Sequence, residues 1–264
     1  MKHFIFISLT LASYSASSYG DMTTWTFDNP DNRFEAKSGN ANIDYYDPSS
    51  TGWGPDSTTF GNAASFNLPL AMDKDLQVMS FPACTNDQGY QLKPNFDPNG
   101  PYGESDGSVS NYTLVMDVLF PTSSMNKWHA LVQTDVTNHS DSELFINQHN
   151  GIGINSNYRG IIQPNTWHRI IWSVRAAPKE GQAQRYIDGQ AIGAIGTTGS
   201  GLDARWSFVS DLLLFTDENG ETASGYVSSI SIIDRKLTHD EAVALGGVNP
   251  LGADIPGPAA PPYN

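Results

Sequence analysis

The 264-residue sequence contains a single cysteine, Cys84. No disulfide can form within the chain, so its stability must come from side-chain packing, with or without a metal ion. The stretch Phe81–Cys84 carries no signature of a catalytic thiol. We therefore expect Cys84 to be a small buried side chain.

Positive charge is also scarce, with 14 Lys and Arg against 28 Asp and Glu, a net charge of −14. Such a surface repels nucleic acids and anionic membranes, and it attracts divalent cations wherever carboxylates converge. The composition therefore argues against a nucleic-acid partner and favours neutral glycans or ligands bridged by a metal ion.

The sequence has no apolar run of the roughly 20 residues that span a bilayer. Its longest apolar stretch near the start, Phe4–Ala12, follows Lys2 and is followed by small residues up to Gly20. This pattern is typical of a secretory signal peptide, with a retained anchor as the alternative. We expect residues 1–20 to be removed and the mature protein to be secreted, either extracellular or periplasmic.

Helical periodicity is nearly absent, whereas apolar residues alternate with a period of two, most clearly over Tyr112–Phe120. This alternation predicts an all-β protein with antiparallel strands in two sheets. Asp188-Gly189 favours a tight hairpin, and Thr238 with Glu241 predicts a capping box at the start of one short helix. Further expected strands are 23–28, 77–81, 128–135, 143–147, 167–175, 184–187, 212–216 and 226–234.

The chain shows no internal repeat and no interdomain linker before residue 249. We expect one domain over residues 21–249. Residues 250–264 contain five prolines and no apolar pattern, which predicts a flexible tail.

Several short segments occur in a characteristic order between residues 110 and 248. They are Trp128–Asp135, Leu144–Ile146, Gly151–Ile154, Thr166–Ile170, Tyr186–Gly189, Leu213–Phe215, Gly225–Ile230 and Asp234–Thr238. This order resembles the laminin-G-like or concanavalin A-like jelly-roll family. The resemblance implies a two-sheet sandwich with one concave sheet, glycan or protein ligands, and often a calcium ion near the rim. It does not fix the function, because this architecture carries lectins, adhesion modules, hydrolases and lyases.

Sugar binding needs aromatic faces for stacking and amides or carboxylates for the hydroxyl groups. In the strand 167–175, alternate residues that include Trp167 and Arg169 lie on the face opposite the core, which could be a ligand floor or simply a half-exposed sheet. The predicted ligand-binding residues are Tyr45, Trp53, Asn147, Asn150, Tyr158, Trp167 and Arg169.

Three oxygen-bearing side chains, Asp135, Asn138 and Asp141, recur at every third residue of one loop. Their oxygens suit calcium, although such residues also stabilise turns without a metal. A second acidic candidate is the segment 217–221, which carries Asp217, Glu218 and Glu221.

An enzymatic function would use other residues. The sequence lacks the Glu-x-Asp-x-x-Glu run that related sandwich hydrolases carry. A polysaccharide lyase would need a base, an acid and a group that neutralises the uronate. His149 would be the base and Tyr158 the acid, with Arg159 or Gln133 at the carboxylate. Whether the chain is an enzyme stays open at this point.

The sequence thus favours a secreted carbohydrate-binding module for an extracellular polysaccharide or glycan, with calcium as a candidate cofactor. The alternatives are the lyase centred on His149 and Tyr158, and an adhesion or accessory module that binds protein.

Overall fold

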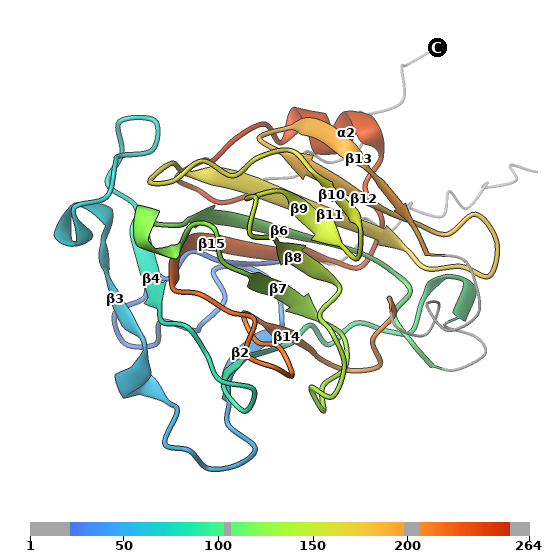
Figure 1. The fold of residues 1–264 in the computed structure, drawn as a ribbon, viewed down its shortest axis with the longest axis horizontal. Coiled ribbons are helices and arrows are strands. Elements are labelled where there is room, and N and C mark those ends of the chain that lie inside the picture. Colours follow the sequence, from blue (N-terminus) through green and yellow to red (C-terminus); the bar gives the residue numbers. More distant parts are fainter. Residues whose placement is uncertain (1–21, 103–106, 198–205, 254–264) are drawn as a thin grey trace, which may run out of the picture.

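The computed structural model describes residues 22–102, 107–197 and 206–253. They form two antiparallel sheets, and the strands of both overlap when the molecule is viewed down its shortest axis (Figure 1). The expected signal peptide at residues 1–20 lies outside the described residues. Over the part that the structure describes, no helix is long and apolar enough to cross a membrane.

Sheet A has the strand order β13-β12-β11-β6-β15-β4-β3, and β1 also pairs with β15. Its strands are β1 (Met22–Trp25), β3 (Thr59–Asn62), β4 (Gln77–Phe81), β6 (Asn111–Leu119), β11 (His168–Arg175), β12 (Gln182–Ile187), β13 (Gln190–Gly196) and β15 (Gly225–Ile233).

Sheet B has the order β10-β9-β8-β7-β14-β5-β2. Its strands are β2 (Asn42–Tyr46), β5 (Gly89–Lys93), β7 (His129–Gln133), β8 (Leu144–Ile146), β9 (Ile152–Ile154), β10 (Asn157–Arg159) and β14 (Leu212–Leu214). The predicted two-sheet antiparallel sandwich is therefore confirmed.

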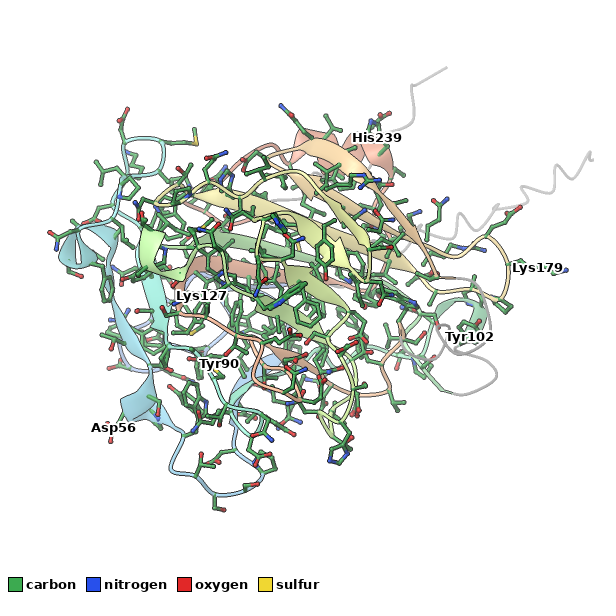
Figure 2. All side chains as sticks on the ribbon, in the orientation of Figure 1. Asp56, Tyr90, Tyr102, Lys127, Lys179 and His239 are labelled. Atoms are coloured by element: carbon green, nitrogen blue, oxygen red, sulfur yellow. The ribbon has the colours of Figure 1, made fainter. Side chains whose placement is uncertain are left out.

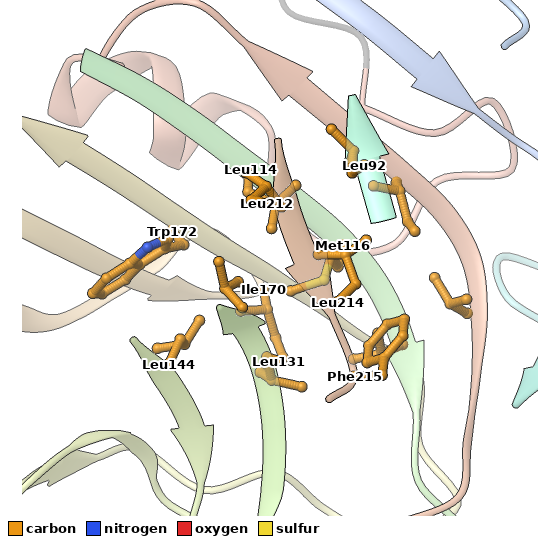
Figure 3. Packing of buried hydrophobic residues seen from close by; sticks show 14 of the residues in the cluster. Leu92, Leu114, Met116, Leu131, Leu144, Ile170, Trp172, Leu212, Leu214 and Phe215 are labelled. Atoms are coloured by element: carbon orange, nitrogen blue, oxygen red, sulfur yellow. The ribbon is translucent and has the colours of Figure 1, made fainter. Parts of the chain in front are cut away.

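The main core lies between the two sheets. Figure 3 shows Met116 and Trp172 of sheet A facing Leu131 and Leu214 of sheet B, all four without solvent exposure. Burial of each such side chain is worth about 1.5–3 kcal/mol. Cys84 is also buried, which raises the pKa of its thiol to about 12, as expected for a structural cysteine.

Turn chemistry sets the local register. Asp188 and Gly189 both have positive φ, 51° and 76°, and join β12 to β13 as the predicted two-residue hairpin. The predicted helix is α2 (His239–Ala244), where Thr238 and Glu241 form the reciprocal capping box.

The outer face of sheet A is covered by the C-terminal part of the chain. Ile171 packs with Leu237 and Leu245 in a second apolar cluster around α2. Ala253 belongs to the same cluster and is 3% exposed. The packed domain thus continues beyond the predicted boundary at residue 249, while residues 254–264 lie outside the described part.

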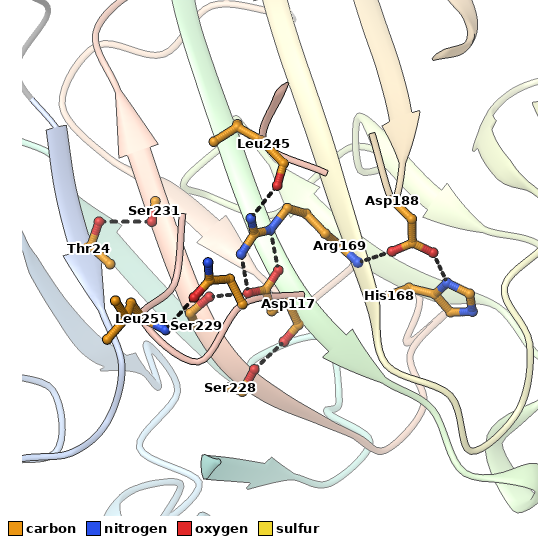
Figure 4. Close-up of polar contacts among 11 residues, drawn as sticks. Thr24, Asp117, His168, Arg169, Asp188, Ser228, Ser229, Ser231, Leu245 and Leu251 are labelled. Atoms are coloured by element: carbon orange, nitrogen blue, oxygen red, sulfur yellow. Dashed lines mark hydrogen bonds and ion pairs between the residues drawn. The ribbon is translucent and has the colours of Figure 1, made fainter. Parts of the chain in front are cut away.

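The sequence suggested that Arg169 lies on a ligand floor. The C-terminal segment that covers this face explains why it does not. Its guanidinium forms two 2.7 Å bonds to Asp117 and one of 2.8 Å to the carbonyl of Leu245 (Figure 4). Arg169 is 1% exposed and Asp117 fully buried. The face opposite the core was predicted correctly for this strand, but it packs beneath the C-terminal segment instead of facing a ligand.

Candidate saccharide-binding face

Three aromatic side chains gather on the outer face of sheet B. The ring of Trp128 lies 5.8 Å from that of Phe145 and 5.7 Å from that of Tyr158, in edge-to-face arrangements. None of the three belongs to the apolar core clusters. We call this group the aromatic patch. Trp128 follows Lys127, which Figure 2 labels.

Strand register brings the patch together. Phe145 of β8 pairs with Gly153 of β9, which in turn pairs with Tyr158 of β10. Trp128 immediately precedes β7, the other neighbour of β8. Phe145 is 3% exposed, whereas Trp128 and Tyr158 are partly exposed.

Arg185 holds the β9–β10 hairpin from beneath. Its guanidinium donates to the carbonyls of Ile152 and Asn157, both at 2.6 Å, and also to Gly193. The side chain is fully buried, and burial together with the charge of Arg159 lowers its pKa to about 10. Any side chain at Gly153 would collide with this guanidinium and with the carbonyl of Asn157. Arg185 and Gly153 therefore fix the position of Tyr158.

Four carboxylates lie beside the aromatic patch, and we call them the acidic corner: Asp141, Asp217, Glu218 and Glu221. Oxygens of the first three lie within 4.8 Å of one another. Asp217, Glu218 and Glu221 lie in the turn that follows β14. The backbone carbonyl of Glu221 accepts a hydrogen bond from the amide of Ala130, at the start of β7. Buried Asp217 accepts bonds from the amides of Ser142 and Asn219.

The pKa shifts show that these groups share one electrostatic environment. Burial, followed by the charges of Asp217 and Asp141, raises the pKa of Glu218 to about 7. Burial and the same two charges raise the pKa of Glu221. Burial, followed by the charges of Glu221 and Asp141, raises the pKa of Tyr158 to about 12. The face thus combines partly exposed rings with several hydrogen-bond acceptors.

The residues proposed for a lyase lie in different environments. Gln133 is fully buried, and its amide nitrogen donates to the carbonyl of Ser140. His149 is exposed in a turn, where its backbone amide donates to Asn147. The Arg159 guanidinium donates to the carbonyl of Tyr158, its own neighbour. Of the four, only Tyr158 contributes its side chain to the aromatic patch.

The three residues proposed for calcium have different partners. Asp135 accepts bonds from Thr137, His139 and Ser140, which lower its pKa against the opposing effect of burial. Buried Asn138 donates to the carbonyl of Asn86 and to Thr216. These two stabilise their loop, as turn residues do. Asp141 instead joins Asp217 and Glu218, from the second acidic candidate in the sequence.

The remaining predicted ligand residues have structural partners. The indole of Trp53 donates to the carbonyl of Gly89, and that of Trp167 donates to Pro69. Tyr45 packs against Phe34 and Tyr90. Asn147 and Asn150 form the turn between β8 and β9, where Asn150 has a φ of 63°.

The sequence missed Trp128 and Phe145 as site residues. Trp128 was assigned to a predicted strand, but it is the only one of the six tryptophans that is not buried. Its place just before a strand, next to Lys127, was the available signal of exposure. Phe145 gave no such signal, since its strand is apolar on both faces.

The fold and this face define a β-sandwich with a candidate ligand surface on one sheet. No family model and no curated protein matches the sequence. A similar solved structure is domain 4 of AbnA, an extracellular GH43 arabinanase of Geobacillus stearothermophilus, in complex with arabinotriose. The TM-score is 0.52 at 15% identity, over 87% of this chain and all of that one.

A second similar structure belongs to botulinum neurotoxin type C, whose cell entry is described as dependent on two ganglioside molecules. Its TM-score is 0.51 at 11% identity, over 86% of this chain and 50% of that one. This chain therefore spans about half of that neurotoxin structure. At such low identities the likeness concerns the fold.

Proposed function

We propose that the chain is a carbohydrate-binding module whose outer sheet B face binds a saccharide without cleaving it. The observation that carries this proposal is the aromatic patch beside the acidic corner. A pyranose or furanose ring would stack on Trp128 and Tyr158, because the apolar face of a sugar matches an aromatic ring. The carboxylates of Asp141 and Glu221 would accept hydrogen bonds from its hydroxyl groups.

The two structural neighbours support the proposal, since one was solved with arabinotriose and the other is described with gangliosides. Gln133 is fully buried and bonded to the Ser140 carbonyl, which gives no support to the lyase alternative. We therefore favour binding over catalysis. A protein-binding module remains an alternative outcome of the test.

The test is a glycan array that includes arabino-oligosaccharides, followed by titration of the best ligand with three proteins. Trp128→Ala should weaken binding by about tenfold or more, as loss of a central aromatic contact does. Trp128→Phe, which keeps a ring, should retain most of the affinity. The ligand should be recovered intact after incubation. Absence of binding to every saccharide, or equal affinity of Trp128→Ala, would contradict the proposal.

We also propose that calcium assists this face. Its ligands would be Asp141, Asp217 and Glu218, because calcium takes six to eight oxygen ligands and these carboxylates converge. Asp135 is not among the described carboxylates that converge with Asp141, so it is not part of this proposed site.

Secretion remains part of the proposal, and it rests on the sequence of residues 1–20. Expression in a host with a functional export pathway should yield a mature protein that begins near Asp21. Amino-terminal sequencing of the exported protein tests this. A chain that keeps Met1 and stays inside the cell would contradict it.

A further inference from the structure

A cavity lies on the outer face of sheet A, on the opposite side of the sandwich from the aromatic patch. It has a volume of about 490 Å³, and we call it the β12 trough. Gln182, Gln184 and Tyr186 of β12 lie on one side, and Lys236 and His239, at the start of α2, lie on the other. Figure 2 labels His239 at this edge of the molecule.

The floor of the trough follows from strand geometry. Residues 182, 184 and 186 alternate along β12 and so share one face, with about 7 Å between successive positions. Arg175 of β11 pairs directly with Gln182 and therefore points to the same side. The two glutamine amides can each donate to and accept from hydroxyl groups.

The wall of the trough is positively charged. Burial and the nearby charge of Arg175 lower the pKa of Lys236, which places the two cations close together. Among the described residues, neither cation forms an ion pair. Their neighbour Arg235 does, with both of its terminal nitrogens on Glu241.

Within the described residues, no acidic side chain forms an ion pair with either cation. Glu241 is engaged by Arg235, Glu180 and Asp240 are exposed, and the Arg175 guanidinium donates to the carbonyl of Glu180. A concentration of unpaired positive charge is unusual in a chain of net charge −14.

We infer that the β12 trough is a second glycan site, which takes the acidic group of a carboxylate- or sulfate-bearing oligosaccharide. Lys236 and Arg175 pair with the anion, and Gln182 and Gln184 bind hydroxyl groups of the neighbouring ring. The charge of this site is positive, whereas that of the acidic corner on sheet B is negative. The inference does not depend on the proposed function, because no residue is shared between the two faces.

Calorimetric titration tests the inference with four probes: an oligogalacturonate hexamer, a sulfated hexasaccharide, a neutral hexasaccharide and inorganic sulfate. At least one of the acidic hexamers should bind, and whichever binds best identifies the acidic group. Lys236→Gln should weaken that binding by about tenfold or more, because it loses a hydrogen bond between two charged groups, whereas Lys236→Arg should retain it. Lys74→Gln, which removes an exposed lysine elsewhere, is the matched control and should change nothing.

Three results would overturn the inference. One is equal affinity of Lys236→Gln and the unchanged protein. Another is binding of inorganic sulfate as tight as that of the acidic hexamer, which would show simple anion attraction. The third is binding of the neutral hexasaccharide at this site. Trp128→Ala separates the two faces, because it should weaken binding on sheet B and leave binding in the β12 trough unchanged.

Discussion

On the outer face of sheet A, the buried ion pair of Arg169 and Asp117 connects the sheet to the C-terminal segment. Burial raises the pKa of Asp117, and its bonds to Arg169 and Ser229 oppose that shift. Arg169→Met would leave Asp117 buried without its cation, so we expect a loss of about 3–5 kcal/mol in the free energy of unfolding. Urea denaturation measures it. The double variant with Asp117→Leu should recover much of the loss, and a single-variant loss below about 1 kcal/mol would contradict this account.

Glu218, in the acidic corner, makes the free energy of unfolding of the protein depend on pH. Its pKa is raised from 4.5 to about 7, so the folded protein binds a proton that the unfolded chain releases. This contribution to stability is present below about pH 4.5 and is lost as the pH rises to about 7. In a chelator, Glu218→Gln should therefore gain stability over the unchanged protein at pH 8 and show little gain at pH 5. Glu35→Gln, at an exposed site, is the control. Parallel pH profiles for Glu218→Gln and the unchanged protein would refute the assignment.

At the scale of elements, the β9–β10 hairpin depends on Arg185. Its hydrogen bonds carry a full charge, and each such bond is worth about 1.5–3 kcal/mol. Arg185→Met should release residues 151–159, which hydrogen exchange would detect as lost amide protection there, with α2 unaffected. Saccharide affinity should fall as well, because Tyr158 loses its support. Arg159→Met, at an exposed neighbour, should leave both measurements unchanged, and unaltered protection in Arg185→Met would contradict the proposed role.

The long strands could be predicted because their alternation is regular. Segment 77–81 coincides with β4, and 112–120 matches β6 to within one residue. Strands β2, β3, β5, β9 and β10 were missed, since they are short and lie among Gly, Asn and Asp residues that also favour loops. Periodicity over so few residues is too brief to outweigh that composition.

At the scale of the whole molecule, the candidate site could be predicted only in part. Tyr158 was proposed from the sequence, and Asp217, Glu218 and Glu221 were noted as an acidic segment. Their meeting with Trp128 depends on the order of strands in sheet B, which places distant segments next to each other. Local pattern carries no information about that order. The same limit made Arg169 look solvent-facing, because its partner Asp117 is 52 residues away.

Calcium should act on the stability of the whole domain. A ligand at one hundred times its dissociation constant adds about 2.7 kcal/mol to a protein that binds it only when folded. For a domain of this size we expect calcium to raise the Tm by about 5–10 °C. Differential scanning fluorimetry with calcium and with a chelator measures the change. Glu218→Gln should reduce the shift, and an unchanged Tm in the unmodified protein would argue against the metal.

The central claim is that a saccharide binds to sheet B through Trp128. The direct test is the ¹H–¹⁵N spectrum of the tryptophan indoles during titration with the best ligand, because Trp128 is the only tryptophan that is not buried. The spectrum of Trp128→Phe assigns its signal. We predict that the Trp128 signal moves with saturating ligand while the other five stay in place. Saturable binding with an unmoved Trp128 signal would contradict the claim.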